Sequence, residues 1–222
     1  VFQLYKSLST IKYIIRYIEQ KEKENYPRLH ALIEDVKVYP YITEAIERII
    51  NKQGKIKDNA SPELKRIKAD ILVKSSSVSR QINSILKRKK DEGIIDKDAT
   101  ASIRDGRLVI PVEASKKRSL HGIVHDESSS GKTVFIEPSE IVELNNDIKE
   151  LELAERREII KILIAFTQSI RPYVEELEKS YDFLGTVDFI RAKARFAMQI
   201  EAVKPTLQSS PELFWKIARH PL

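Results

Sequence analysis

The segment SPELKRIKADILVKSSSVSRQINSILKRKKDEG, residues 61–93, predicts one long amphipathic helix. The Ser61 side chain can accept a hydrogen bond from the free amides of the first turn, and Pro62 stands where no N–H is needed. Glu63 suits the positive end of the helix dipole. Apolar residues then recur seven positions apart, at Leu64, Ile71, Val78 and Ile85. About 30 residues at 1.5 Å each make a helix roughly 45 Å long.

A second long helix is predicted to open at Pro138 and to run until Pro172, which should kink or restart it. Residues 61–104 carry 11 Lys and Arg against 6 Asp and Glu, whereas residues 138–180 carry 6 against 10. Opposite charges favour laying the two helices side by side and antiparallel within one chain. Dimerisation of two chains through the same heptads is the less favoured interpretation, because a single intervening segment joins the helices.

Between the two helices the apolar period changes from helical to alternating, which is typical of short strands. Asp105-Gly106 predicts a tight hairpin turn, because such turns need a positive φ that Gly supplies. Pro111 lacks a backbone N–H, so its strand is expected to be an edge strand or to carry a bulge. We therefore expect a small antiparallel sheet in residues 94–137.

The remaining residues predict further helices. Residues 1–60 show apolar residues at helical spacing, and an amphipathic pattern resumes after Tyr181 and is expected to pack back on residues 1–60. Residues 213–222 resemble a strand. The expected fold is mainly α and elongated: a helical core (1–60 and 181–222), an outgoing helix (61–93), a β-rich tip (94–137) and a returning helix (138–180).

Composition excludes several classes of protein. Only 6 Gly and 9 Pro in 222 residues argue against an all-β fold. The absence of Cys excludes disulfides, thiolate metal sites and Cys nucleophiles, and it fits a reducing compartment, so we expect the cytoplasm. No apolar run approaches the roughly 20 residues needed to cross a bilayer, so no membrane association is expected.

Three passages resemble the MutS family, in particular its second, recombination-suppressing branch. They are DGRLVIPV at 105–112, GIVHDESSSGKTVFIEP at 122–138 and VELNN at 142–146. The resemblance implies that residues 61–180 form a lever of two helices carrying a β-rich clamp, and that the flanks form the helical core. It also implies that the run Ala218–Pro221 opens an ATPase domain.

The resemblance further implies an ATPase that dimerises through its ATPase domain and, in this branch, carries an Smr-type nuclease domain. Neither module falls within this sequence, so we expect no enzymatic activity and no cofactor here, with ATP and magnesium serving the whole protein. The function implied for these residues is a non-catalytic grip on branched or duplex DNA, coupled mechanically to the ATPase, in a protein that suppresses homologous recombination.

Two groups of cations are candidate contacts for the nucleic-acid backbone, since Lys and Arg need only meet phosphates to add affinity. The first lies in the tip and comprises Lys116, Lys117 and Arg118, supported by Arg104, Arg107 and Lys132. The second ends the outgoing helix and comprises Lys87, Arg88, Lys89 and Lys90. For the first group the alternative is a solvated turn that only keeps the tip soluble. For the second group the alternative is a solvated helix end whose cations complement the helix dipole.

Two other motifs do not indicate a binding site. Gly131-Lys132-Thr133 copies the end of a phosphate-binding loop, but Asp126 stands where that motif needs Gly, so a hairpin loop is favoured. His121 and His125 are too far apart on a strand to share a metal, and surface histidines are favoured. The alternative function is a coiled coil that docks on a protein or on a ribosome through ribosomal RNA, without contacting DNA.

Overall fold

The structure is a computed structural model that describes residues 1–214, and it divides into two compact units. Unit 1 comprises residues 1–47 together with those from 167 onward, and unit 2 comprises residues 48–166. The chain is mainly α-helical with one four-stranded antiparallel sheet, as the sequence predicts. None of the described helices combines the length and apolar character needed to span a membrane.

Unit 1 is helical. It contains α1 (Phe2–Glu19), α2 (Pro27–Ile33), most of α3 (Pro40–Ile49), the short 3₁₀ helix η3 (Arg171–Tyr173) and α6 (Val174–Gln199). As predicted, Pro172 interrupts the helix, and α6 restarts after it. Helix α1 buries one stripe and lies against α2 and α6. The buried residues of that stripe are Leu8, Ile11, Ile15 and Ile18.

Only the first part of the last helix, α6, has buried residues, although packing on the N-terminal helices is expected for the segment after Tyr181. α6 buries Leu177, Ser180 and Phe183, but none of its residues beyond Phe183 is buried. Residues 200–214 form no helix or strand. The strand expected at 213–222 and the run Ala218–Pro221 fall mainly or wholly on residues 215–222, which lie outside the described residues.

Unit 2 contains one of the two long helices completely and the other up to Phe166. α4 (Pro62–Asp91) is a single 30-residue helix, and its predicted cap is present, since the Leu64 amide donates to Ser61 Oγ at 3.0 Å. α5 (Val142–Ile170) begins later than predicted, because Pro138 ends strand β4 and the 3₁₀ helix η2 (Ser139–Ile141) precedes it. The extended pairing of β4 therefore prevails over the helix-start signal at Pro138.

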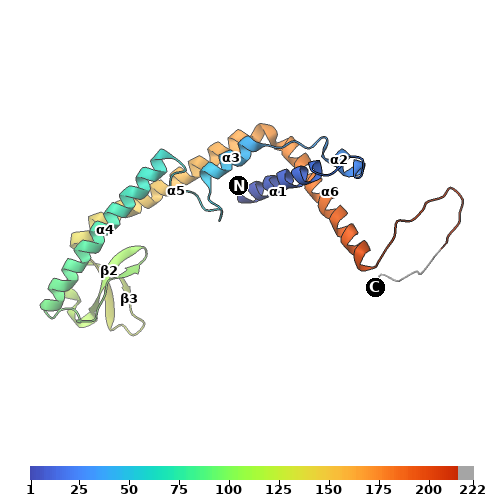
Figure 1. Ribbon diagram of the computed structural model, residues 1–222. Helices are drawn as coiled ribbons and strands as arrows, with labels where there is room; N and C mark the ends of the chain where they lie inside the picture. Colours follow the sequence, from blue (N-terminus) through green and yellow to red (C-terminus); the bar gives the residue numbers. More distant parts are fainter. Residues whose placement is uncertain (215–222) are drawn as a thin grey trace. The chain divides into compact units, whose positions relative to one another are not determined.

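Helices α4 and α5 lie side by side and antiparallel (Figure 1). In the polar contacts between them, the residue numbers rise along α4 while they fall along α5, as expected for antiparallel helices. They join Ser61 to Glu158 at 2.8 Å, Lys68 to Glu155 at 3.1 Å, Lys74 to Asp147 at 2.5 Å and, where η2 leads into α5, Arg88 to Glu140 at 3.0 Å. The three ion pairs each join a cation of α4 to an acid of the returning chain, so the opposite charges seen in the sequence do meet within one chain.

The sheet follows the order β1-β2-β4-β3, with β1 at Ser102–Arg104, β2 at Arg107–Glu113, β3 at Gly122–Glu127 and β4 at Thr133–Pro138. Arg104 pairs with Arg107 across the predicted hairpin turn, where Asp105 and Gly106 have φ of 50° and 75°. These angles are those of a two-residue type I′ turn. The 3₁₀ helix η1 (Ala114–Ser119) joins β2 to β3.

Pro111 does not lie on an edge strand, because β2 has β1 on one side and β4 on the other. However, β1 pairs with β2 only as far as Val109. Backbone groups two residues apart on a strand face the same neighbour, so Pro111 faces the side on which β1 has already ended. The missing N–H therefore breaks no ladder, and the bulge lies instead on β3, between Val124 and Asp126.

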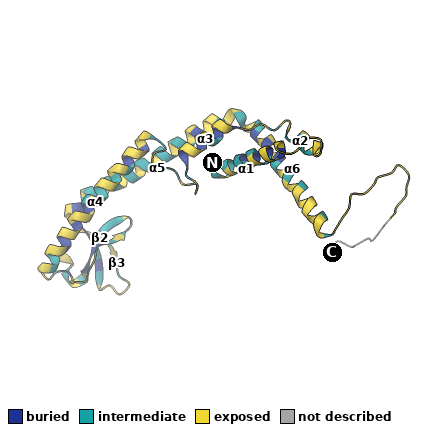
Figure 2. Cartoon of the chain, viewed as in Figure 1, coloured by how far each residue is buried: buried dark blue, intermediate teal, exposed yellow. Residues whose placement is uncertain are grey.

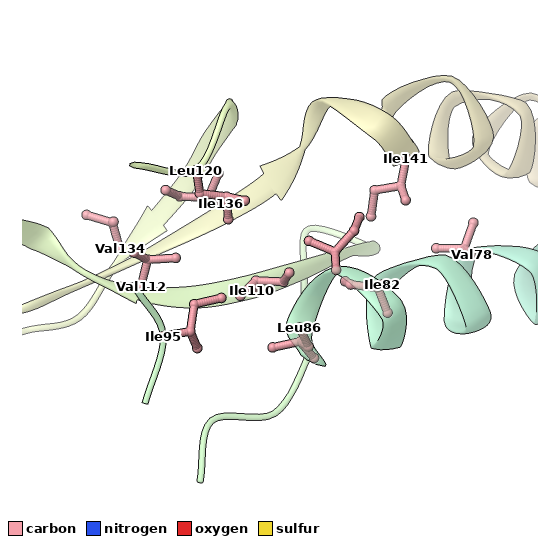
Figure 3. Packing of buried hydrophobic residues seen from close by; sticks show 11 residues of the cluster. Val78, Ile82, Leu86, Ile95, Ile110, Val112, Leu120, Val134, Ile136 and Ile141 are labelled. Carbon is pink, nitrogen blue, oxygen red and sulfur yellow. The ribbon is translucent and has the colours of Figure 1, made fainter. Parts of the chain in front are cut away.

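One face of the sheet packs against the C-terminal half of α4 (Figure 3). Ile110 of β2 lies beside Ile82 and Leu86 of α4, Val112 lies farther along the strand near Ile95, and Ile141 lies at the end of the cluster near Val78. Each fully buried side chain of this kind contributes about 1.5–3 kcal/mol. The predicted tip is thus fixed on the end of α4 by an apolar core of its own.

Candidate nucleic-acid interface

The first predicted cations, Lys116, Lys117 and Arg118, lie on η1, and the fold fixes this short helix at both ends. The Ala114 amide donates to the Lys132 carbonyl at 2.9 Å, and Leu120 is buried in the core beside α4. Lys116 Nζ donates to the Gly93 carbonyl at 3.2 Å, just past the end of α4. The structure therefore brings η1 to the end of α4 where the second group of predicted cations lies.

Four of the ten predicted cations are exposed and have no ion-pair partner among residues 1–214. Two lie on η1, one in the loop between β3 and β4, and one near the end of α4: Lys117, Arg118, Lys132 and Lys87. Such side chains keep their full charge available for a ligand. We call these four residues the free cations.

The other cations near the end of α4 are engaged within the chain. Arg88 pairs with Glu140 at 3.0 Å, Lys89 with Glu92 at 2.7 Å, and Lys90 Nζ donates to the Lys97 carbonyl at 2.6 Å. Cations near a helix C-terminus also complement the helix dipole. Any binding by these three residues has to compete with these contacts.

Arg104 lies on the face of the sheet that turns away from α4. Its Nε pairs with Asp126 at 3.0 Å, and its guanidinium lies 4.0 Å from the centroid of the Phe135 ring. The side chain is 37% exposed, so part of the guanidinium remains accessible. Arg104 thus covers the one aromatic ring of the sheet.

Arg107 is part of a polar network that the sequence does not signal. Its Nη1 donates to both oxygens of Glu137, at 2.8 and 3.1 Å, and its Nη2 donates to Asn146 Oδ1 at 2.6 Å. Glu137 is completely buried and also accepts from Asn145 Nδ2 at 2.7 Å and bonds His125 Nε2 at 2.6 Å. The partners are 30, 8 and 12 positions from Glu137, so no local pattern could have revealed the network.

The network keeps Glu137 ionised. Burial by itself raises the pKa of a carboxyl group, but hydrogen bonds from Asn145, His125 and Arg107, together with the charge of Arg107, outweigh burial and hold the pKa of Glu137 below its ordinary value. His125 is therefore not the surface histidine that the sequence suggested, because only 17% of its side chain is exposed. His121 is exposed, outside β3.

An open groove of about 930 Å³ lies between residues 94–99 and the end of β2. Asp96, Asp98 and Glu113 line it together with Lys97 and Lys132. Three carboxylates repel phosphate, so Lys132 is the one free cation in this groove and the rest of the groove does not extend the cationic surface. Within residues 1–214 no three His, Asp or Glu side chains converge in a way that could hold a metal ion.

The loop at Gly131-Lys132-Thr133 is the turn of the β3–β4 hairpin, as the sequence favours, because Ser128 and Thr133 pair across it. Unit 2 is also poor in aromatic residues. Between Tyr41 and Phe166 the sequence contains one, Phe135, which Arg104 covers. The surface of this unit therefore offers cations but no exposed ring on which a base could stack.

The curated relatives of this chain carry one name. No family model matches the chain, but curated relatives named "Endonuclease MutS2" do. The protein of Enterococcus faecalis is 34% identical over 222 residues, covering 99% of this chain and 28% of the relative. Those of Finegoldia magna and Carboxydothermus hydrogenoformans are each 39% identical, over 97% and 89% of this chain.

The chain spans about a quarter of the length of these relatives, 25–28% in the three proteins. The matches confirm the resemblance to the second MutS branch, because they extend along nearly the whole chain rather than along one motif.

Proposed function

Since this chain is similar along nearly its whole length to proteins named Endonuclease MutS2, we propose that unit 2 is a non-catalytic clamp that holds branched or duplex DNA. In this proposal the clamp belongs to a longer protein that suppresses homologous recombination. ATP hydrolysis with magnesium, nuclease activity and homodimerisation through the ATPase domain are functions of that longer protein.

The observation that carries the proposal is the position of the free cations. Lys117, Arg118 and Lys132 lie around the end of the sheet, and the Lys116–Gly93 hydrogen bond brings η1 to the end of α4, on which Lys87 lies. Cations held on separate elements of one rigid core can meet several phosphates at once. Each phosphate neutralised releases condensed counterions, which gives affinity without reading sequence.

The chemistry of unit 2 favours the backbone over the bases. Proteins that bind single strands usually stack bases on aromatic rings, and unit 2 offers no exposed ring among its described residues. The free cations lie on a 3₁₀ helix, a hairpin loop and a helix end. None of these is a long helix that could enter the major groove by its side and read base edges. A duplex, whose phosphates are regularly spaced, is the ligand that suits such a surface.

The helix pair supplies the mechanical part of the proposal. α4 and α5 are joined side by side by ion pairs along their length, and the sheet is fixed to the end of α4. A stiff pair of this kind turns a small rotation at its base into a larger displacement at its tip. We infer that nucleotide binding elsewhere in the longer protein opens and closes the clamp in this way.

Fluorescence anisotropy with a labelled branched DNA, measured over a series of salt concentrations, tests the proposal. We expect log K to fall linearly with log salt, and the slope to become shallower by about 3 when Lys117, Arg118 and Lys132 are all changed to Glu. The control changes the net charge equally at exposed cations elsewhere, with Lys23, Arg28 and Lys65 changed to Glu. Equal weakening by both triple variants, or by neither, would refute the assignment of the free cations.

A second candidate is a docking surface for a protein or for a ribosome. It is favoured by exposed apolar residues in the middle of α4, where Leu72 and Val73 are 69% and 64% exposed. Apolar docking predicts binding that barely responds to salt and that Leu72→Ser with Val73→Ser removes. The same salt series therefore separates the two functions.

A further inference from the structure

The face of the sheet that turns away from α4 carries a stacked pair of side chains, Arg104 and Phe135. The guanidinium carbon of Arg104 lies over the Phe135 ring, 4.0 Å from its centroid, which is an ordinary contact distance between carbon atoms. Phe135 is the only aromatic residue between Tyr41 and Phe166 in the sequence. The pair is therefore the only stack of a cation on a ring within the described residues of unit 2.

Three contacts hold the Arg104 guanidinium in place. Nε pairs with Asp126 at 3.0 Å, Nη1 donates to the Ile103 carbonyl at 3.0 Å, and the Phe135 ring covers one of the two faces of the group. Since 37% of the side chain is exposed, the surface left to solvent comprises the opposite face, Nη2 and the methylene stem. The plane of the guanidinium is thus fixed before any ligand arrives, which lowers the entropy cost of binding to it.

The guanidinium of Arg104 can be reached from solvent. β1 and β3, the edge strands that carry Arg104 and Asp126, have no buried residue (Figure 2). The chain leaves unit 2 at Phe166, whereas Lys149, the α5 residue beside the hairpin turn at Gly106, lies about 25 Å along the helix from it. This face of the sheet therefore does not lie beside that connection to the rest of the chain.

The part of Arg104 that stays free suits a base better than a phosphate. Arginine usually recognises phosphate through two parallel N–H donors, but here Nε and Nη1 are both engaged and only Nη2 is left. The other free surface is a flat and weakly hydrated plane. Unpaired nucleobases stack on arginine planes of this kind, as they do on aromatic rings.

We propose that the outward face of Arg104 is a stacking platform for one unpaired base of a branched DNA. The platform deepens the clamp function proposed above and rests on it. Lys132, one of the free cations, lies three residues before Phe135 on the same hairpin, about 10 Å along the strand. A DNA strand whose phosphate meets Lys132 can therefore place a nearby base on Arg104. A fully paired duplex keeps its bases inside the helix, so the clamp prefers a branch point that has an unpaired base.

Fluorescence anisotropy with the whole chain tests the platform on two labelled three-way DNA junctions that differ at one position. The first junction has an unpaired thymine at the branch, and the second has an abasic residue in its place. We expect the first junction to bind about tenfold more tightly, which corresponds to the stacking of one base. Adenine in place of the thymine should preserve this preference, because every base has a π-face.

Two variants remove the platform in different ways. Arg104→Lys keeps the charge beside Asp126 but has no plane, and Phe135→Leu removes the ring beneath the guanidinium. Both should bring the ratio of the two dissociation constants close to unity and leave the salt slope unchanged, because the number of phosphates met is the same. Arg66→Lys is the matched control, since Arg66 is also exposed and pairs with Glu63 at 2.7 Å but has no ring contact among the described residues. It should leave the ratio unchanged, and circular dichroism verifies that each variant is folded.

The outcomes separate the platform from the clamp. Equal affinity of the unchanged protein for the two junctions, or a preference that Arg104→Lys retains, overturns the platform although DNA binding by the free cations stands. A variant Arg104→Lys that weakens binding to both junctions equally makes Arg104 a phosphate contact and also overturns the platform. Failure to bind either junction overturns the platform and the clamp together.

Discussion

Arg107 and Glu137 form an ion pair at 2.8 Å between the hairpin strand β2 and the end of β4, and the carboxylate is completely buried. The pair is held in place by His125 of β3 and by Asn145 and Asn146 of α5. Three strands and the returning helix thus meet at one carboxylate. Arg107, which the sequence predicts as a contact for nucleic acid, therefore pairs within the chain with Glu137. This pair fixes the sheet to the N-terminal end of α5.

Replacing Glu137 by Gln should destabilise unit 2 by about 3 kcal/mol, because removing one member of a buried pair leaves donors without their charged acceptor. The free energy of unfolding can be measured by urea denaturation followed by circular dichroism. The control is Glu140→Gln, which breaks the exposed pair with Arg88 and should change stability by less than about 1 kcal/mol. Equal effects of the two variants would contradict a special role for Glu137.

The lowered pKa of Glu137 also predicts how stability depends on pH. A carboxyl group with a pKa below its ordinary value of 4.5 in the folded state stabilises the fold fully above that pH. The contribution is lost as the pH falls through the folded pKa. The difference in stability between the wild type and Glu137→Gln should therefore shrink below pH 4.5, since the protonated Glu resembles Gln. A difference that stays constant into the acid range would show that the charge is unimportant.

Gly122→Ala should be severely destabilising. A Cβ at this position would lie 2.1 Å from the Glu137 carbonyl oxygen and 2.8 Å from Ile136 Cγ2, so β3 has to move away from β4. Gly131→Ala is a matched comparison in the same hairpin, because its Cβ meets no atom within 4 Å and its cost is only that of a φ of +68°, about 1–2 kcal/mol. Thermal unfolding of the two variants should rank Gly122→Ala well below Gly131→Ala. The reverse order would show that β3 does not approach β4 as closely as described.

Ser61→Ala should lower the stability of unit 2 by about 1 kcal/mol, because the Leu64 amide loses its cap. The substitution also removes the hydrogen bond to Glu158 of α5. Ser76→Ala in the middle of the same helix should have the opposite sign, since Ser76 is exposed and bonds only the Leu72 carbonyl of its own helix. Chemical denaturation of both variants measures whether their free energies of unfolding change in these opposite directions.

Much of the fold was predictable because its signals are local. The cap at Ser61, the turn at Asp105-Gly106 and the break at Pro172 each depend on residues within a few positions, and all three are present. The start of α5 was predicted too early, because the helix-start signal at Pro138 competes with strand pairing to residues far away in sequence. Long-range pairing prevailed over a local preference.

The sequence predicts the candidate site only as a set of residues, without their environments. The sequence identified ten cations, but their environments depend on partners such as Glu140 for Arg88, Asp126 for Arg104 and Glu137 for Arg107. These partners lie 22 or more positions away, so no spacing rule reaches them. Which cations remain free is a consequence of the folded chain.

The order of residues alone predicted most of the helical and strand segments, the antiparallel pairing of two oppositely charged helices within one chain, and the lack of thiol chemistry, since each follows from composition or from periods of a few residues. Only the tertiary structure decided that the sheet packs on α4, that the buried Glu137 forms an ion pair with Arg107, and that α6 has no buried residue beyond Phe183. These features arise from contacts between residues distant along the chain, whose energies depend on burial and geometry that a linear pattern does not contain.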